Sequence, residues 1–88
     1  MEYIYPAIFR RNDDGSFTIV YPDLPGCISE GKTLGNAMSM AESALTQWIE
    51  YLIDKNEEIP HASDIMELSV EEDEFTTLVQ AKIALVAM

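Results

Sequence analysis

The chain has 88 residues, of which 48% are hydrophobic, and sixteen acidic against five basic side chains give a formal net charge of −11. This length predicts a single domain over residues 1–88, and the hydrophobic fraction excludes a disordered chain. The charge disfavours the phosphate backbone of DNA or RNA as a direct ligand, so the acidity either suits a basic partner or merely keeps the domain soluble.

The first predicted feature is a β-hairpin. Tyr3 to Arg11 and Ser16 to Tyr21 are rich in aromatic and β-branched residues, and the Asp14-Gly15 step between them suits a tight turn. Pro6 has no amide hydrogen and is expected near the start of the first strand or on an unpaired edge. One face of the second strand carries Phe17, Ile19 and Tyr21, and the other carries Ser16, Thr18 and Val20.

The stretch Pro22-Asp23-Leu24-Pro25-Gly26 then turns the chain, because its two prolines interrupt a sheet ladder. Cys27 to Glu30 is predicted as a short third strand that ends at Gly31. Thr33 is a good N-cap, since its hydroxyl can accept a hydrogen bond from an unpaired amide of a helix's first turn.

A long amphipathic helix follows. Its apolar residues recur at the i, i+3, i+4, i+7 spacing of one buried stripe, which predicts a helix lying on a sheet. Met40 and Tyr51 fall outside the stripe, either as partner contacts or, as we favour, as isolated exposed apolar residues. The stripe consists of Leu34, Ala37, Met38, Ala41, Ala44, Leu45, Trp48, Ile49, Leu52 and Ile53.

Asn56 and Pro60 close the helical region, and residues 59–65 are expected to form a loop or short turn. The acidic run Glu71 to Glu74 is interpreted as a solvated loop instead of a metal cage. The last strand is predicted from Phe75 to Met88, with a helix over residues 80–88 as the competing structure. One face of this strand carries Phe75, Val79, Ala81, Ile83, Leu85 and Ala87.

These elements predict an α+β domain of order β-β-β-α-β, with a small mixed sheet and the long helix packed on one face. A helix between two strands allows the last strand to lie parallel to an earlier one by a right-handed crossover. The other face stays open, lined by Ile8, Val20 and Leu78, and such a face marks an interface. The apolar edge of the last strand predicts homodimerisation or a higher homo-oligomer.

Residues 26–33, GCISEGKT, match the phosphate-loop pattern G-x-x-x-x-G-K-[ST]. A nucleotide-binding module using Gly26, Gly31, Lys32 and Thr33 is therefore an alternative function. Glu30 beside the phosphates and Pro25 just before the loop weigh against it, and a turn, a short strand and a helix cap explain the same residues.

Enzymatic sites find little support. Cys27 and His61 are each unique, so a nucleophilic Cys-His pair is formally available, but a lone cysteine beside a turn is more often a small buried residue. Zinc requires three or four ligands, and a residual metal-dependent nuclease requires converging carboxylates, which the first strand lacks. We expect no cofactor or metal and no catalysis.

A single cysteine without a signal-peptide pattern predicts a cytoplasmic protein, and no apolar run approaches the length of a membrane span.

Four motifs together resemble the HicB family of antitoxins, over about Tyr3 to Pro60. They are Tyr5-Pro6-Ala7-Ile8-Phe9, Asp13-Asp14-Gly15, the hexapeptide motif after Tyr21 that spans Pro22, Asp23, Leu24, Pro25, Gly26 and Cys27, and Gly31-Lys32-Thr33-Leu34 at the start of an Ala-rich helix. The resemblance implies a truncated ribonuclease H-like fold without nuclease carboxylates. We interpret the motif residues Tyr21 to Cys27 as structural, and the partner-binding residues stay unassigned.

The resemblance also implies binding to a HicA-type toxin, a small basic ribonuclease that cleaves messenger RNA, and masking of its active site. Two features depart from the family pattern. Gly35-Asn36 replaces the acidic pair often found at the helix start, and the chain has no room for the separate DNA-binding domain that many relatives carry at their C-terminus. We therefore expect no direct binding to nucleic acid.

Overall fold

The computed structural model describes residues 2–83. The predicted element order and the α+β class are confirmed, with a 3-10 helix, η1, added after the long helix. The last predicted strand extends to Met88, but its residues 84–88, including Leu85 and Ala87, lie outside the described residues. The elements are β1 (Glu2–Arg11), β2 (Phe17–Val20), β3 (Ile28–Gly31), α1 (Leu34–Asp54), η1 (Ile65–Glu67) and β4 (Glu74–Lys82).

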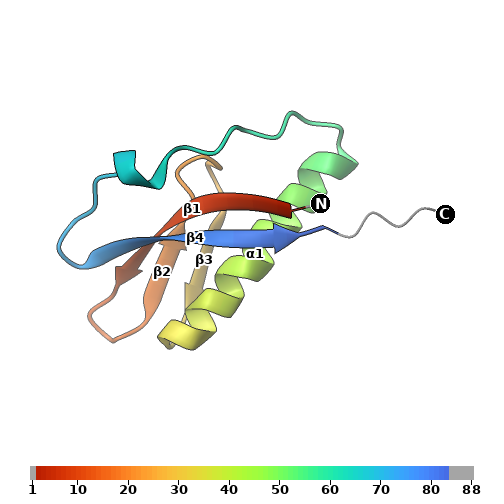
Figure 1. Cartoon of the computed structure of the whole chain (residues 1–88). Coiled ribbons are helices and arrows are strands. Elements are labelled where there is room, and N and C mark those ends of the chain that lie inside the picture. Colours follow the sequence, from red (N-terminus) through yellow and green to blue (C-terminus); the bar gives the residue numbers. More distant parts are fainter. Residues whose placement is uncertain (1, 84–88) are drawn as a thin grey trace.

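The sheet has the strand order β3-β2-β1-β4, and its three pairings are all antiparallel. The predicted mixed sheet, with its last strand parallel to an earlier one, is therefore wrong. The cause is the connector over residues 55–73, which runs back along the sheet after α1 ends (Figure 1). It delivers Glu74 opposite Arg10 and Lys82 opposite Glu2, so β4 runs against β1.

The connector is tied to the sheet by side-chain hydrogen bonds. The Tyr5 hydroxyl donates to the Pro60 carbonyl, and Ser63 donates to the Asp23 carboxylate from its backbone N–H at 2.9 Å and from its hydroxyl at 2.5 Å. Beyond these ties η1 packs beside β4. The ties fix the route of the connector and with it the direction in which β4 enters the sheet.

The core lies between α1 and one face of the sheet. From α1 it takes Ala37, Ala41, Leu45 and Ile49, each fully buried at the predicted helical spacing. Alternate strand residues meet them, as the period-two pattern predicted: Tyr5, Ala7, Phe9, Ile19, Tyr21, Val79, Ala81 and Ile83. Leu34 and Ile53 of the predicted stripe are exposed, because both lie in the terminal turns of α1.

Pro6 occupies a position in β1 where its missing amide hydrogen breaks no ladder bond. The pairing of β1 with β2 ends at Ile8, so Pro6 has no β2 partner. On the β4 side, the Arg11 N–H donates to the Asp73 carbonyl. Hydrogen-bonded and non-hydrogen-bonded pairs alternate along an antiparallel ladder, so Pro6 occupies a non-hydrogen-bonded position opposite Leu78. The proline is therefore tolerated inside a central strand.

Candidate functional site

The turn between β2 and β3 carries the residues of the family motif and anchors the sheet to α1. The Tyr21 hydroxyl donates to the Ala41 carbonyl at 2.6 Å, and Leu24 is buried beneath the turn. Gly26 has φ +97, and a Cβ there would lie 3.1 Å from the Trp48 ring. These contacts place the buried motif residues between the sheet and the helix, whereas Pro22 and Pro25 are exposed.

The phosphate-loop residues do not form a loop. Ile28–Gly31 are a strand paired with β2, and a Cβ on Gly31 would lie 2.3 Å from the Ala37 Cα, so this glycine lets the helix approach the strand. The Thr33 hydroxyl accepts from the Asn36 N–H at 3.1 Å, as predicted for an N-cap, and the Lys32 N–H donates to Asn36 Oδ1 at 2.9 Å.

A phosphate loop directs consecutive amides toward one anion, whereas the amides of a strand point alternately to opposite sides. GCISEGKT is thus a turn, a strand and a cap, and its geometry does not support nucleotide binding.

Cys27 is buried, and its thiol approaches the Ala44 carbonyl at 3.8 Å. Burial raises the pKa of the Cys27 thiol to about 11, so the reactive thiolate is scarce at neutral pH. His61 is exposed in the connector. Within residues 2–83 no group of three or more His, Cys, Asp or Glu residues is placed to hold a metal ion. No helix in the described part of the chain is long and apolar enough to span a membrane.

The sheet face opposite α1 carries an apolar row across three strands. Ile8, Val20 and Ile28 are successive cross-strand neighbours, and the predicted Leu78 lies on the same face of β4. Ile28 is 59% exposed and Leu78 is 53% exposed, so this face is open where they lie. Pro6 on this face is nevertheless buried, and η1 passes beside the neighbouring β4, so part of the face is covered.

Sequence reasoning assigned Ile8, Val20 and Leu78 to this face and missed Ile28. The alternation of the third strand would have found it, because buried Cys27 and Ser29 place Ile28 on the other side.

A charged row borders the apolar one. Glu30, Thr18, Arg10 and Glu74 are cross-strand neighbours, and the Arg10 guanidinium donates to Glu74 Oε2 at 3.0 Å from Nε and 2.8 Å from Nη2. The Glu71 backbone N–H and the Arg10 guanidinium together lower the pKa of Glu74. Arg10 is thereby neutralised by Glu74, and Glu30 leaves the row with a net negative charge.

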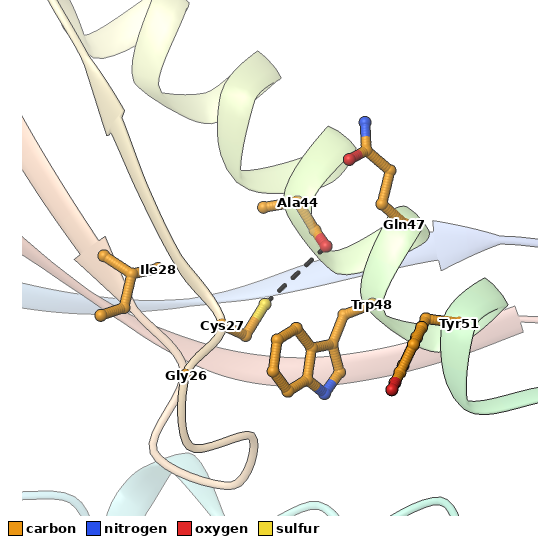
Figure 2. A pocket seen from close by; sticks show the side chains of 7 residues that line it. All are labelled: Gly26, Cys27, Ile28, Ala44, Gln47, Trp48 and Tyr51. Atoms are coloured by element: carbon orange, nitrogen blue, oxygen red, sulfur yellow. Dashed lines mark hydrogen bonds between the residues drawn. The ribbon is translucent and has the colours of Figure 1, made fainter. Parts of the chain in front are cut away.

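A groove separates β3 from the outer side of α1 (Figure 2). It has a volume of about 540 Å³, with the Trp48 ring lying toward Gly26 and with Gln47 and Tyr51 on the helix. Tyr51 is 55% exposed, as is expected for a residue outside the buried stripe. The groove is lined by Gly26, Cys27, Ile28, Ala44, Gln47, Trp48 and Tyr51.

Comparison with known proteins assigns a family to this arrangement. The family described as "HicB_like antitoxin of bacterial toxin-antitoxin system" matches residues 5–87. The chain is 37% identical over 62 residues to an uncharacterized 14.9 kDa protein in the rep-hol intergenic region of Haemophilus phage HP1, covering 70% of the chain and 46% of that protein. It is 32% identical over 56 residues to antitoxin HicB 1 of Photorhabdus laumondii, covering 64% of the chain and 36% of that antitoxin. The chain thus spans less than half the length of these two relatives.

Solved structures with the same fold include the toxin-antitoxin complex from Streptococcus pneumoniae, at a TM-score of 0.84 and 24% identity, covering 93% of the chain and 70% of the matched chain. The N-terminal domain of Burkholderia pseudomallei antitoxin HicB matches at a TM-score of 0.76 and 24% identity, covering 94% of the chain and 100% of that domain. The expected fold is confirmed, with an antiparallel sheet in place of the mixed one.

Proposed function

The chain belongs to the HicB-like antitoxin family, and from this premise we propose that it neutralises a small basic toxin of the HicA type by covering the active site with which that toxin cleaves messenger RNA. Binding, without catalysis, is the whole of the proposed activity. The buried, protonated Cys27 supports this, because a nucleophilic thiol would need a lowered pKa.

The observation that carries the proposal is an apolar, partly uncovered sheet face on a strongly acidic domain. Ile4, Ile28 and Leu78 are each about half exposed on that face, whereas Phe9 and Ile19 on the α1 side are fully buried. A soluble domain that leaves several large apolar side chains together on one face gains by burying them against a partner.

The net negative charge of the domain favours a positively charged partner. With a net charge of −11, the domain attracts a basic protein at long range and repels RNA, so the toxin is drawn to the antitoxin while the toxin's substrate is not. Electrostatic attraction of this kind accelerates encounter, and apolar burial then slows dissociation. We therefore expect the association rate constant to fall as salt rises.

Self-association through β4 is the second part of the proposal. β3 and β4 are the two edge strands of the sheet. The hydrogen bond from Arg11 to Asp73 shows which residues of β4 bond to β1, and the residues between them point the other way. The backbone N–H and C=O groups of Thr76, Leu78 and Gln80 therefore point outward. Antiparallel pairing with a second copy about Leu78 would place Glu74 opposite Lys82 of the partner subunit. Such a dimer pairs the free backbone edge of β4 and places each Lys82 opposite a carboxylate.

The functional test uses the small basic protein encoded in the neighbouring reading frame. Its cleavage of RNA should stop when the antitoxin is added in equimolar amount, and the two proteins should co-elute at moderate salt. Reversing two exposed acids, Glu30→Lys with Glu50→Lys, should slow association at low salt, whereas the isosteric pair Glu30→Gln with Glu50→Gln should slow it less. Undiminished cleavage together with the absence of a complex would refute the proposed function.

The dimer is tested separately by sedimentation over a range of concentrations. We expect association that Leu78→Lys abolishes, since this change places two like charges at the two-fold axis. A monomer at all concentrations would remove this part of the proposal and leave toxin binding intact.

A further inference from the structure

The outer edge of β3 presents unpaired backbone groups. β3 pairs with β2 on one side only. The Tyr21 N–H donates to the Cys27 carbonyl at 3.3 Å. Because hydrogen-bonded pairs recur at every second residue of an antiparallel ladder, the N–H and C=O groups of Ser29 and Gly31 point toward β2. The N–H and C=O groups of Ile28 and Glu30 therefore point outward, and no hydrogen bond among the described residues uses them.

Two hollows continue along this edge, between β3 and α1. The first is the groove that contains Trp48 and Tyr51 (Figure 2). The second, of about 360 Å³, lies toward the start of the helix and is lined by Glu30, Gly31 and Met40 among others. Met40 and Tyr51, the two apolar helix residues outside the buried stripe, are 43% and 55% exposed, and each lines one hollow. A free strand edge thus runs beside two partly apolar hollows, which together are called the channel below.

We propose that this edge binds an extended segment of a basic partner protein, which adds to β3 as a fifth strand and inserts an apolar side chain into the groove beside Trp48. Strand addition of this kind takes its affinity from backbone hydrogen bonds and its specificity from pockets for alternate side chains. The proposal rests on the proposed function, because the partner is the same basic toxin, and it adds the surface and the mode of recognition.

The charges around the channel favour a basic segment. Asp14 and Glu30 line the second hollow together with one base, Lys32. At the other end Gln47 lines both the Trp48 groove and a neighbouring hollow that contains Glu42 and Glu50. Four acids therefore flank the channel against one base, so a cationic segment gains electrostatic energy that an acidic one loses.

A second copy of this chain fits the edge poorly. Antiparallel self-pairing of β3 about Ser29 would place Ile28 opposite Glu30 of the partner subunit, and pairing about Glu30 would place the two carboxylates opposite each other. Pairing about Ile28 would place Glu30 opposite Gly26 of the partner subunit, outside the strand. A basic strand from another protein instead continues the apolar row of Ile8, Val20 and Ile28 onto its own side chains. The edge is therefore assigned to the toxin and the β4 edge to self-association.

Amide hydrogen exchange, read by NMR residue by residue, tests this assignment on the full chain. In the free protein the amides of Ile28 and Glu30 should exchange at least about tenfold faster than those of Ser29 and Gly31, which bond to β2 and serve as internal controls. On addition of the small basic protein from the neighbouring reading frame, exchange at Ile28 and Glu30 should slow by about tenfold or more.

A matched pair of substitutions gives a second measurement. Tyr51→Ala removes an exposed ring beside the groove and should weaken the complex about tenfold or more by calorimetry. Met66→Ala removes a side chain that is 86% exposed on η1, away from the channel, and should leave affinity unchanged. Circular dichroism on both variants separates lost binding from lost folding.

The outcomes are distinguishable. A complex that leaves Ile28 and Glu30 unprotected and tolerates Tyr51→Ala overturns the assignment of this edge but leaves the antitoxin function standing. Protection that grows with the concentration of the free chain alone assigns the edge to a second copy and likewise overturns the proposal. Failure of any complex to form refutes the proposed function itself.

Discussion

Replacing Gly31 by alanine should destabilise the domain, because α1 lies directly against this glycine. An added Cβ would fall 2.3 Å from the Ala37 Cα and 2.4 Å from its backbone nitrogen. Ordinary contact between carbon atoms begins near 3.5 Å, so helix and strand must separate by about 1 Å. Both contacts are with backbone, and rotation of a side chain cannot relieve them. Overpacking of this kind lowers the free energy of unfolding by about 1–3 kcal/mol.

Gly35→Ala is the matched control. Gly35 lies in the first turn of α1, and an added Cβ there would have no neighbouring atom within 4 Å, so the same chemical change meets open space. Alanine is also the better helix former, and we expect a gain of about 0.5 kcal/mol.

Urea and thermal unfolding, followed by circular dichroism, measure both variants. The melting temperature should fall by about 4–8 °C per kcal/mol lost for Gly31→Ala and rise slightly for Gly35→Ala. Equal stability of Gly31→Ala and the natural chain would refute the close approach of helix and strand.

Three further experiments test other parts of the structure: labelling of Cys27 in the natural chain and two substitutions. Because burial raises the pKa of Cys27 to about 11, the native thiol should resist iodoacetamide at neutral pH and react on unfolding; rapid native labelling would contradict this burial. Tyr21→Phe removes a buried hydrogen-bond donor and should lower the free energy of unfolding in urea by about 1 kcal/mol, and an unchanged value would count against that bond. The Glu71 amide and Arg10 lower the pKa of Glu74, so its stabilising effect is present above its ordinary pKa of 4.5 and is lost as the pH falls. Glu74→Gln should therefore be less stable than the natural chain near neutral pH and equal to it in strong acid, and an equal difference at both would refute the interaction.

The elements were predictable from sequence where a local pattern determines them. The period-two alternation of Phe17, Ile19 and Tyr21 fixed the inward face of the hairpin, and the helical spacing of Ala37 and Leu45 fixed the buried stripe. Thr33 marked the start of the helix by its capping chemistry. These features depend on residues close together in the chain.

The direction of β4 was not predictable, because it depends on contacts between residues distant in sequence. Two ties, from Tyr5 to Pro60 and from Asp23 to Ser63, route the connector back along the sheet. A short crossover was the simpler interpretation of a helix between two strands. No periodicity in residues 55–73 indicated where that segment would cross.

The channel beside β3 was also not predictable from local sequence patterns. Its existence depends on which strand lies at the edge, and that follows from the placement of β1 between β2 and β4. Met40 and Tyr51 gave the available signal, since both interrupt the polar side of α1. Taken alone, each was an ordinary exposed residue.

The placement of β1 between an early strand and the last one has a consequence for synthesis. Glu2 pairs with Lys82, at the far end of the described chain, and this most distant pairing completes the sheet. Contacts of such long sequence separation form late and slowly. In a nascent chain on the ribosome, the side of β1 that faces β4 therefore stays unpaired until β4 emerges. A messenger cut before the codons for β4 yields a fragment with this side unpaired, which proteases can attack.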